Sequence, residues 1–314
     1  MKPAELTRKV KEIVLANNLD YVGITPVERL TGEPEGRRPT DYLPGAHSVV
    51  SLGIKLSLGV QLANRLAYQG GLRHSIYSYL WYGFGMPSLH YLDRTALLVT
   101  RLLEKEGHIA TPVMAISTFD IQSNLMEFSN AHAAVAAGHG ELGWSGLALT
   151  PDVGPRVRFS SVITTAHLEP DSIYRGPRLC DVDECKRLGQ GIPICAKACA
   201  THAIGPGGVT VAIGDRNFDV AKFDRFRCMW GSMGLLEATL GLKDIPMPDK
   251  EKIDAGDVFD ALAKRDPSQS LELMVIGRGD YCGQCIMECP VERPGQLDEM
   301  VPGAPKSKYK EERR

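Results

Sequence analysis

Residues 281–290 read YCGQCIMECP, and this short stretch carries three cysteines with a proline directly after the last one. The spacing C-x2-C-x3-C-P is typical of ligands to an iron–sulfur cluster. A four-iron cluster needs four thiolates, so at least one ligand has to come from another part of the chain. The use of this segment therefore depends on where the other cysteines lie.

The composition is that of a globular protein long enough for two domains, with 314 residues, 43% hydrophobic and 24% charged. The net charge is 36 − 38 = −2, which excludes a global positive field that recruits nucleic acid or an anionic membrane. The first residues predict an amphipathic helix rather than a signal peptide, and no run approaches the ~20 apolar residues of a membrane span. We therefore expect a cytoplasmic protein, in which clustered thiols favour metal over disulfides.

The cysteines divide the chain, because all eight lie after residue 179. We predict a cysteine-free α/β domain over residues 1–175, a metal-carrying domain over 176–304 and a charged, disordered tail over 305–314. Two zinc sites are one alternative for the cysteines, since C-x2-C serves both metals. Two [4Fe-4S] clusters account better for the number of cysteines and for the C-x3-C-P ending.

The first half alternates between expected strands and helices. Helices are predicted over 3–18 and 88–106, and strands over 21–25, 48–54, 108–116 and 156–165. Such alternation favours an α/β (or α+β) sandwich. Residues 74–85, HSIYSYLWYGFG, form either an aromatic core segment or a wall for a large planar ligand. In the second case Tyr77, Tyr79 and Tyr82 are candidate proton donors.

Both cysteine-rich segments resemble the bacterial ferredoxin run C-x2-C-x2-C-x3-C-P, in which the fourth cysteine binds the other cluster. The first segment, 180–204, has a stretched form of this spacing and ends in C-x3-C. The second, 282–289, lacks one upstream cysteine, which leaves Cys228 to supply it. The resemblance implies crossed ligand sets: Cys180, Cys185, Cys195 and Cys289 on one cluster, and Cys199, Cys228, Cys282 and Cys285 on the other.

Residues 133–171, AAVAAGHGELGWSGLALTPDVGPRVRFSSVITTAHLEPD, resemble a stretch shared by corrinoid-dependent reductive dehalogenases and epoxyqueuosine reductases. Residues 21–30 (YVGITPVERL) and 43–54 (LPGAHSVVSLGI) are similar to upstream elements of the same families. The resemblance implies a nitroreductase-like α/β domain that binds cobalamin, followed by a ferredoxin-like domain with two [4Fe-4S] clusters.

The same resemblance implies which residues hold base-off cobalamin, with flavin as a minor alternative cofactor: Gly143, Trp144, Ser145, Gly146, Gly154, Arg156 and Arg158. Of Arg156 and Arg158, we expect at most one to face the cofactor and the other to be a surface ion-pair partner. Glu127 falls where epoxyqueuosine reductases carry an acidic proton donor, whereas dehalogenases use a tyrosine with a basic residue. His132 is either part of this site or a core histidine.

The leading hypothesis is a cytoplasmic, cobalamin-dependent reductase with two [4Fe-4S] clusters that acts on a small organic substrate with dehalogenase-like chemistry. It needs a low-potential electron donor of the ferredoxin or flavodoxin type and no membrane. The first alternative is an epoxyqueuosine reductase acting on tRNA, which predicts a basic face near the pocket mouth. The second is an electron-transfer or corrinoid-activating protein with no substrate of its own. The oligomeric state stays open.

Overall fold

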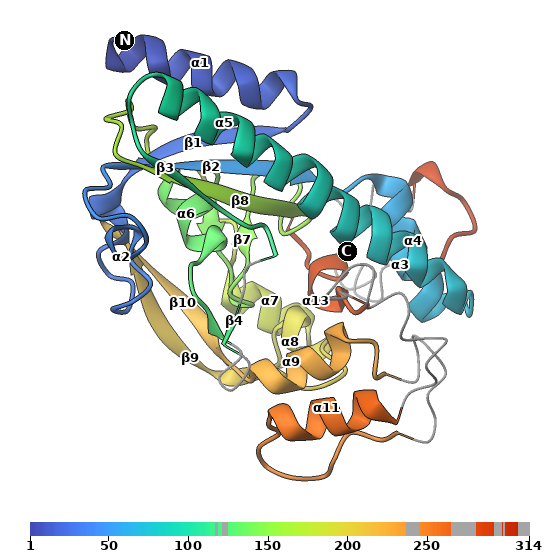
Figure 1. The fold of residues 1–314 in the computed structure, drawn as a ribbon. Coiled ribbons are helices and arrows are strands. Elements are labelled where there is room, and N and C mark those ends of the chain that lie inside the picture. The colour runs from blue at the N-terminus through green and yellow to red at the C-terminus, as the bar shows by residue number, and fades with distance from the viewer. Residues whose placement is uncertain are drawn as a thin grey trace.

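The computed structural model describes residues 1–116, 119–120, 125–236, 245–264, 281–291, 297 and 299–306. Its centre is a four-stranded sheet in the order β1–β2–β8–β3 (Figure 1). The strands are β1 (Tyr21–Pro26), β2 (Ser48–Lys55), β8 (Val157–Thr164) and β3 (Ala110–Val113). Each lies where a strand is predicted, and every neighbouring pair is antiparallel, so the architecture is α+β.

Helices cover both faces of this sheet. On one face lie α1 (Pro3–Ala16) and α5 (Asp93–Lys105), and on the other lies α6 (Asn130–Ala136) (Figure 1). The first layer buries a continuous cluster of aliphatic side chains from α1, α5 and the strands, in which Leu103 and Val50 have no exposed surface. β2 is buried along most of its length because helices pack against it from both sides.

The remaining elements are short and lie between or after these: η1 (Val27–Leu30), α2 (Pro39–Tyr42), α3 (Leu58–Gln69), η2 (Arg73–Ser75), α4 (Ile76–Leu80), η3 (Trp81–Leu92), β4 (Phe119–Asp120), β5 (Leu125–Met126), β6 (Glu141–Leu142), β7 (Ala148–Leu149), α7 (Val182–Leu188), α8 (Ile194–Lys197), β9 (Ile204–Ile213), β10 (Arg216–Phe223), α9 (Arg225–Ser232), α11 (Ala255–Ala263) and α13 (Gln284–Met287).

The helix predicted over 88–106 begins later than expected. The α-helix α5 starts at Asp93, and the turns before it, η3, are π-helical and contain Pro87. Proline has no N–H for an α-helical bond, and a wider turn tolerates this loss. The aromatic segment 74–85 is helical, and it is divided between core and surface: Tyr79 is buried, whereas Tyr82 is exposed.

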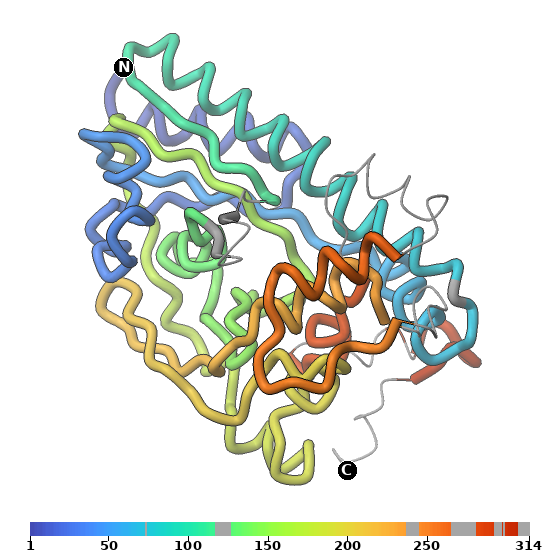
Figure 2. The backbone as a smooth tube through the Cα atoms, turned by 60° about the horizontal axis from the view of Figure 1, so that its bottom comes forward, coloured from blue at the N-terminus to red at the C-terminus, as the bar shows by residue number. Residues whose placement is uncertain are grey.

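The second half packs on the first through two shared hydrophobic clusters. The β9–β10 hairpin lies beside the loop that holds η1, as Figures 1 and 2 both show, and Gly214 N donates to Arg29 O at 2.8 Å. Around α4, the buried side chains of Ile76 and Tyr79 pack with Tyr281 and Met287. The domain boundary at residue 175 stays a prediction, because the buried clusters cross it.

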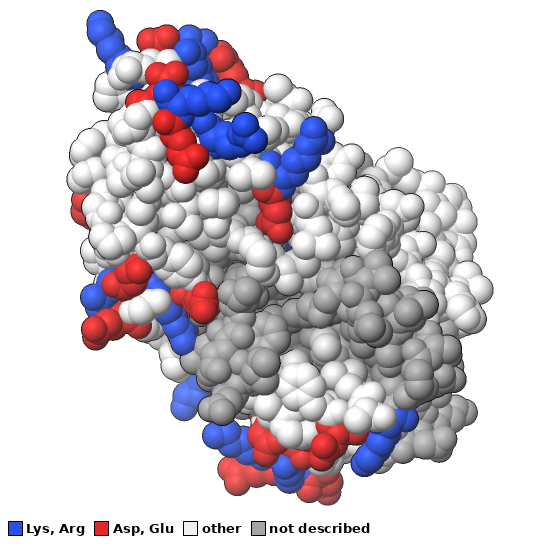
Figure 3. Space-filling model, viewed as in Figure 1, with Lys and Arg blue, Asp and Glu red and all other residues white. Residues whose placement is uncertain are grey.

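Charges of both signs mix on the face seen in Figure 3, where they gather over α1 and around α11. This fits the net charge of −2. Within the described residues, no helix combines the length and the apolar character needed to cross a membrane. Of the predicted tail, residues 307–314 lie outside the described residues.

Two leucines of α5 test the packing of this layer. Leu103 is completely buried, whereas Leu97 on the same helix is 51% exposed. We expect Leu103→Ala to lower the free energy of unfolding by about 2–5 kcal/mol, because it removes core contacts and leaves a cavity. Leu97→Ala is the matched control and should change it by less than about 0.5 kcal/mol. Denaturant unfolding of the two variants measures the difference, and equal losses would contradict this packing.

Candidate functional site

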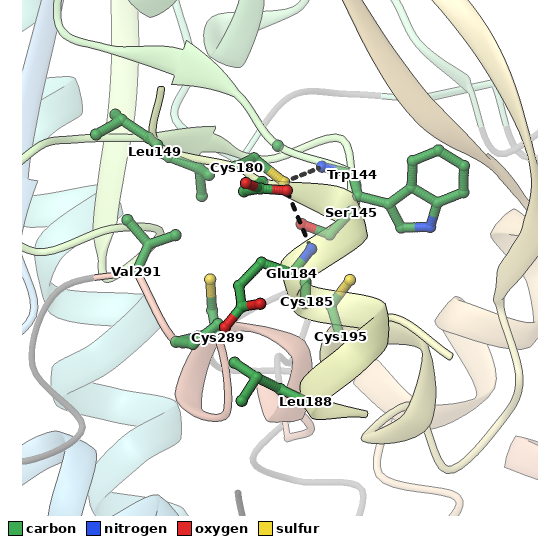
Figure 4. A pocket seen from close by; sticks show the side chains of 14 residues that line it. Trp144, Ser145, Leu149, Cys180, Glu184, Cys185, Leu188, Cys195, Cys289 and Val291 are labelled. Carbon is green, nitrogen blue, oxygen red and sulfur yellow. Dashed lines mark hydrogen bonds between the residues drawn. The ribbon is translucent and has the colours of Figure 1, made fainter. Parts of the chain in front are cut away.

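Four cysteines from two distant segments line one cavity of about 120 Å³. They are the set that the crossed pattern assigns to one cluster: Cys180, Cys185, Cys195 and Cys289. Figure 4 shows them around one hollow, with Cys289 reaching it from the segment after α13 and the others from the chain around α7 and α8. Gly143, Trp144 and Ser145 line the same hollow.

Local structure explains how the first three of these thiols come together. Asp181 caps α7 by accepting from Asp183 N and Glu184 N, which places Cys180 just before the helix and Cys185 in its second turn. The chain then turns back at Pro193, and the short helix α8 brings in Cys195. Proline just before the first turn of a helix fixes the backbone for this entry.

Backbone N–H groups point at the sulfurs of this region. Trp144 N donates to Cys180 Sγ at 3.3 Å, and Ile194 N donates to Cys185 Sγ at 3.2 Å. Burial raises the pKa of the Cys180 thiol to about 12 and also raises that of Cys195. Such buried thiols bind as thiolates when a cationic metal centre compensates their charge, and N–H···S bonds then stabilise them.

The other four cysteines line a second cavity of about 260 Å³. They are again the set that the crossed pattern predicts: Cys199, Cys228, Cys282 and Cys285. Apolar side chains of the first half complete its wall, among them Phe84, Leu147 and Phe159. Ser145 lines both cavities and so marks where they adjoin.

The C-x3-C spacing separates neighbouring ligands in the way the ferredoxin resemblance implies. Cys195 lies on α8 and lines the first cavity, whereas Cys199 follows the helix and lines the second, where Ala203 N donates to its sulfur at 3.2 Å. None of the eight cysteines forms a disulfide bond in the part of the chain that the structure describes. Among the described residues, no group of three or more His, Cys, Asp or Glu side chains is close enough to hold a single metal ion. Cluster binding itself stays a prediction, and two sets of four thiol donors fit it.

The seven residues assigned to cobalamin do not form one site. Gly143, Trp144 and Ser145 line the first cysteine cavity. Gly154 and Arg156 pack against the segment around Cys289: a Cβ at Gly154 would lie 2.4 Å from Val291 O, and Arg156 donates to Cys289 O at 2.6 Å.

The remaining members of this set differ from one another. Gly146 has φ of +76° in the turn between β6 and β7, where no atom lies within 4 Å of an added Cβ. Arg158 lines the second cavity together with Ser145. A cofactor beside the second cavity would therefore meet Arg158 and Ser145 rather than all seven residues.

The expected surface ion-pair role for one of the two arginines is wrong. Arg156 is only 3% exposed and donates to backbone carbonyls instead. It precedes β8, so its side chain does not follow the strand alternation and turns toward the 287–291 segment. Arg158 donates to Gly83 O at 3.0 Å and to the Tyr79 hydroxyl oxygen at 3.1 Å, and it lies over the Phe84 ring.

The four predicted proton donors occupy different surroundings. The Tyr79 hydroxyl is buried between Arg158 and Gly283, both of which line the second cavity; a Cβ at Gly283 would lie 2.2 Å from it. Tyr77 packs edge-on against Tyr281.

The other two candidates are exposed. Tyr82 is 57% exposed, and Glu127 is exposed and accepts a hydrogen bond from the Tyr42 hydroxyl at 3.3 Å. Burial, followed by the nearby Glu127 carboxylate, raises the pKa of Tyr42 to about 12. Neither Tyr82 nor Glu127 is among the described residues that line a cysteine cavity. His132 bonds to the buried carboxylate of Glu33 at 2.5 Å, which favours its role in the core.

A basic groove lies next to the second cavity, and the sequence did not indicate which residues form it. It has a volume of about 580 Å³ and is lined by Lys222, Arg225, Arg227 and Lys252. Asp224 is the one acidic residue among the described residues that line it, and its carboxylate caps α9. The groove and the second cavity share Ala203 and Phe223.

No protein-family model and no curated protein sequence matches the chain. Solved structures do: the catabolic reductive dehalogenase NpRdhA in complex with 3-bromo-4-hydroxybenzoic acid has a TM-score of 0.50 at 17% identity over 88% of this chain and 36% of that one. Its K488Q variant gives a TM-score of 0.50 at 15% identity over 91% and 38% of the two chains.

The fold is therefore similar to the matched part of these reductive dehalogenases. This chain spans about a third of the length of the dehalogenases that it matches. An epoxyqueuosine reductase in complex with a tRNA-Tyr stem loop is also similar, with a TM-score of 0.43 at 15% identity over 90% of this chain and 79% of that one. Reductive dehalogenases are one of the two families that the sequence resembles.

The crossed ligand sets of this dehalogenase-like fold can be tested with two cysteines of one segment. Cys289→Ala should remove the cluster shared with Cys180, Cys185 and Cys195, whereas Cys285→Ala should remove the other, because the two thiols line different cavities. Each variant should keep about half of the wild-type iron. Iron determination and EPR of the reduced proteins measure this, and the loss of one and the same signal in both variants would contradict the crossing.

Proposed function

We propose that this protein is a cobalamin-dependent reductase that passes electrons through two [4Fe-4S] clusters to a small organic substrate. The observation that carries this proposal is the grouping of eight cysteines into two adjoining cavities, four to each. Four thiolates are the ligand set of a [4Fe-4S] cluster, and adjoining clusters allow fast electron transfer. A low-potential donor of the ferredoxin or flavodoxin type would supply the electrons, and the cytoplasm, where thiols stay reduced, is the proposed location.

The second cavity is the proposed place of reaction. Cysteines form one part of its wall, and the other part is apolar surface from the first half, with Arg158 as its basic residue. Reduced cobalt in cobalamin supplies a strong nucleophile or electron donor that no side chain provides. Flavin is the minor alternative. Cobalamin enters the proposal through the sequence resemblance and the dehalogenase fold.

We assign proton donation to the Tyr79 hydroxyl, with Arg158 as the side chain that positions it. The guanidinium of Arg158 holds the Tyr79 hydroxyl oxygen at 3.1 Å and so fixes its position behind the cavity wall. When the hydroxyl gives up its proton, the adjacent cation stabilises the phenolate that is left. The apolar wall around them keeps water away from the reduced centre.

Cofactor content tests this function before any substrate is known. After anaerobic purification in the presence of cobalamin, we expect about eight iron atoms and about one cobalt per chain, with the absorbance of a bound corrinoid. Metal analysis, flavin determination and the anaerobic spectrum measure this. Full iron without cobalt would contradict the reductase and favour an electron-transfer or corrinoid-activating protein instead. Bound flavin would favour the flavin variant.

The basic groove favours one alternative, epoxyqueuosine reduction on tRNA. The described residues of its lining carry four cations and one carboxylate, or +4 − 1 = +3, in a chain with a net charge of −2. A concentration of positive charge beside a reaction cavity suits a polyanion such as a nucleic acid backbone. Ala203 and Phe223 line both the groove and the second cavity. A polyanion bound in the groove would therefore reach the mouth of the second cavity.

A queuosine assay separates the two functions. If the protein acts on tRNA, expression in a strain that lacks epoxyqueuosine reductase should restore queuosine, as measured in digested tRNA. Lys222→Ala with Lys252→Ala should then reduce this strongly, because both lysines line the groove, whereas Lys9→Ala on the exposed side of α1 should not. No queuosine from a chain that holds both clusters would remove this alternative.

A further inference from the structure

The buried guanidinium of Arg156 binds the chain segment that delivers Cys289. Its Nη2 donates to Met287 O at 2.9 Å and to Cys289 O at 2.6 Å, and its Nη1 donates to Val291 O at 3.0 Å. These three carbonyls belong to every second residue from 287 to 291 and so lie at, before and after the predicted ligand Cys289. A planar guanidinium can reach three of them together, which a single ammonium cannot do with the same geometry.

The backbone on the other side of Arg156 is packed just as closely. Thr150 and Gly154 exchange two backbone hydrogen bonds of 2.9 Å, and this turn holds Gly154 in a left-handed conformation, with φ of +58°. A Cβ at Gly154 would lie 2.4 Å from Val291 O. The turn and the segment around Cys289 therefore leave no room for a shift of one relative to the other.

Arg156 also places a positive charge beside the first cavity. It is 3% exposed, and among the described residues the side chains of Cys289, Arg65 and Glu288 interact with it electrostatically. A buried charge interacts strongly because little water screens it. Such a charge favours the more negative, reduced state of a nearby iron–sulfur cluster.

We infer that Arg156 is a positioning residue for the cluster of Cys180, Cys185, Cys195 and Cys289: it fixes the segment that carries the crossing ligand, and its charge raises the reduction potential of that cluster relative to the other. This inference rests on the proposed function, because it needs [4Fe-4S] clusters in the two cavities. It replaces the cobalamin contact that the sequence resemblance implies for this arginine.

Redox titration followed by EPR tests the charge. The signal that Cys289→Ala removes identifies the first cluster. In Arg156→Gln we expect the midpoint potential of this cluster to fall, while that of the second cluster stays at the wild-type value. Arg156→Lys keeps the charge and should restore most of the potential. Arg101→Gln, which removes an exposed arginine of α5, should shift neither cluster.

Iron release to a chelator tests the positioning. Both Arg156→Gln and Arg156→Lys should lose iron from the first cluster about ten to a hundred times faster than wild type, because both lose the three-carbonyl contact. Potentials and release rates like those of wild type in both variants would overturn the inference. Equal shifts of both clusters would also overturn it.

Failure of the proposed function has a different signature. If the wild-type protein binds no [4Fe-4S] clusters, the proposed function fails first. If it binds two and only the Arg156 variants behave like wild type, the inference alone fails. Should Arg156→Gln not accumulate as a folded protein, the release rate of Arg156→Lys decides on positioning, and the neutral variant Arg156→Met takes the place of Arg156→Gln in the redox titration.

Discussion

One short segment, residues 281–291, has to serve two cavities, and much of the molecule is arranged to hold it. Cys282 and Cys285 line the second cavity, while Cys289, one helical turn further on, lines the first. The segment turns into α13 at Gly283, whose left-handed backbone has φ of +65°. Three cysteines so close in sequence can face two directions only if this turn is held in one conformation.

The first half of the chain supplies that restraint. From α3, Asn64 donates to Cys282 O at 2.8 Å and accepts from Gln284, Tyr68 donates to Tyr281 O at 3.0 Å, and Gln69 donates to Glu288. Arg156 binds the same segment from its other end. The segment that carries these cysteines is thus fixed by hydrogen bonds that do not involve metal, which is how a protein preorganises a site.

The sequence predicts the strands well, because they depend on local patterns, and the family resemblance divides the cysteines into the same two groups that line the two cavities. The β-branched run of β2 and the alternation in β8 each specify a strand without knowledge of its partner. The assignment of Cys195 and Cys199 to different sets comes from the ferredoxin resemblance, and in the structure α8 ends at Lys197 between them. The roles of Arg156 and Tyr79 depend instead on residues far along the chain. Periodicity does not report such contacts, so the sequence assigns Arg156 to a cofactor and leaves three tyrosines equivalent.

The β9–β10 hairpin packs against the loop of η1, and Cys289 lies far along the chain from the other three cysteines of the first cavity. These two features have a consequence for biosynthesis. During synthesis, Cys180, Cys185 and Cys195 emerge long before the thiol that completes their set, so a nascent chain presents three ligands and an open position. Domains commonly fold while the ribosome is still adding residues. Here the sheet can form early, but loading of the proposed first cluster would have to wait until residue 289 has been released and docked. The order of assembly is thus set by where one thiol lies in the chain.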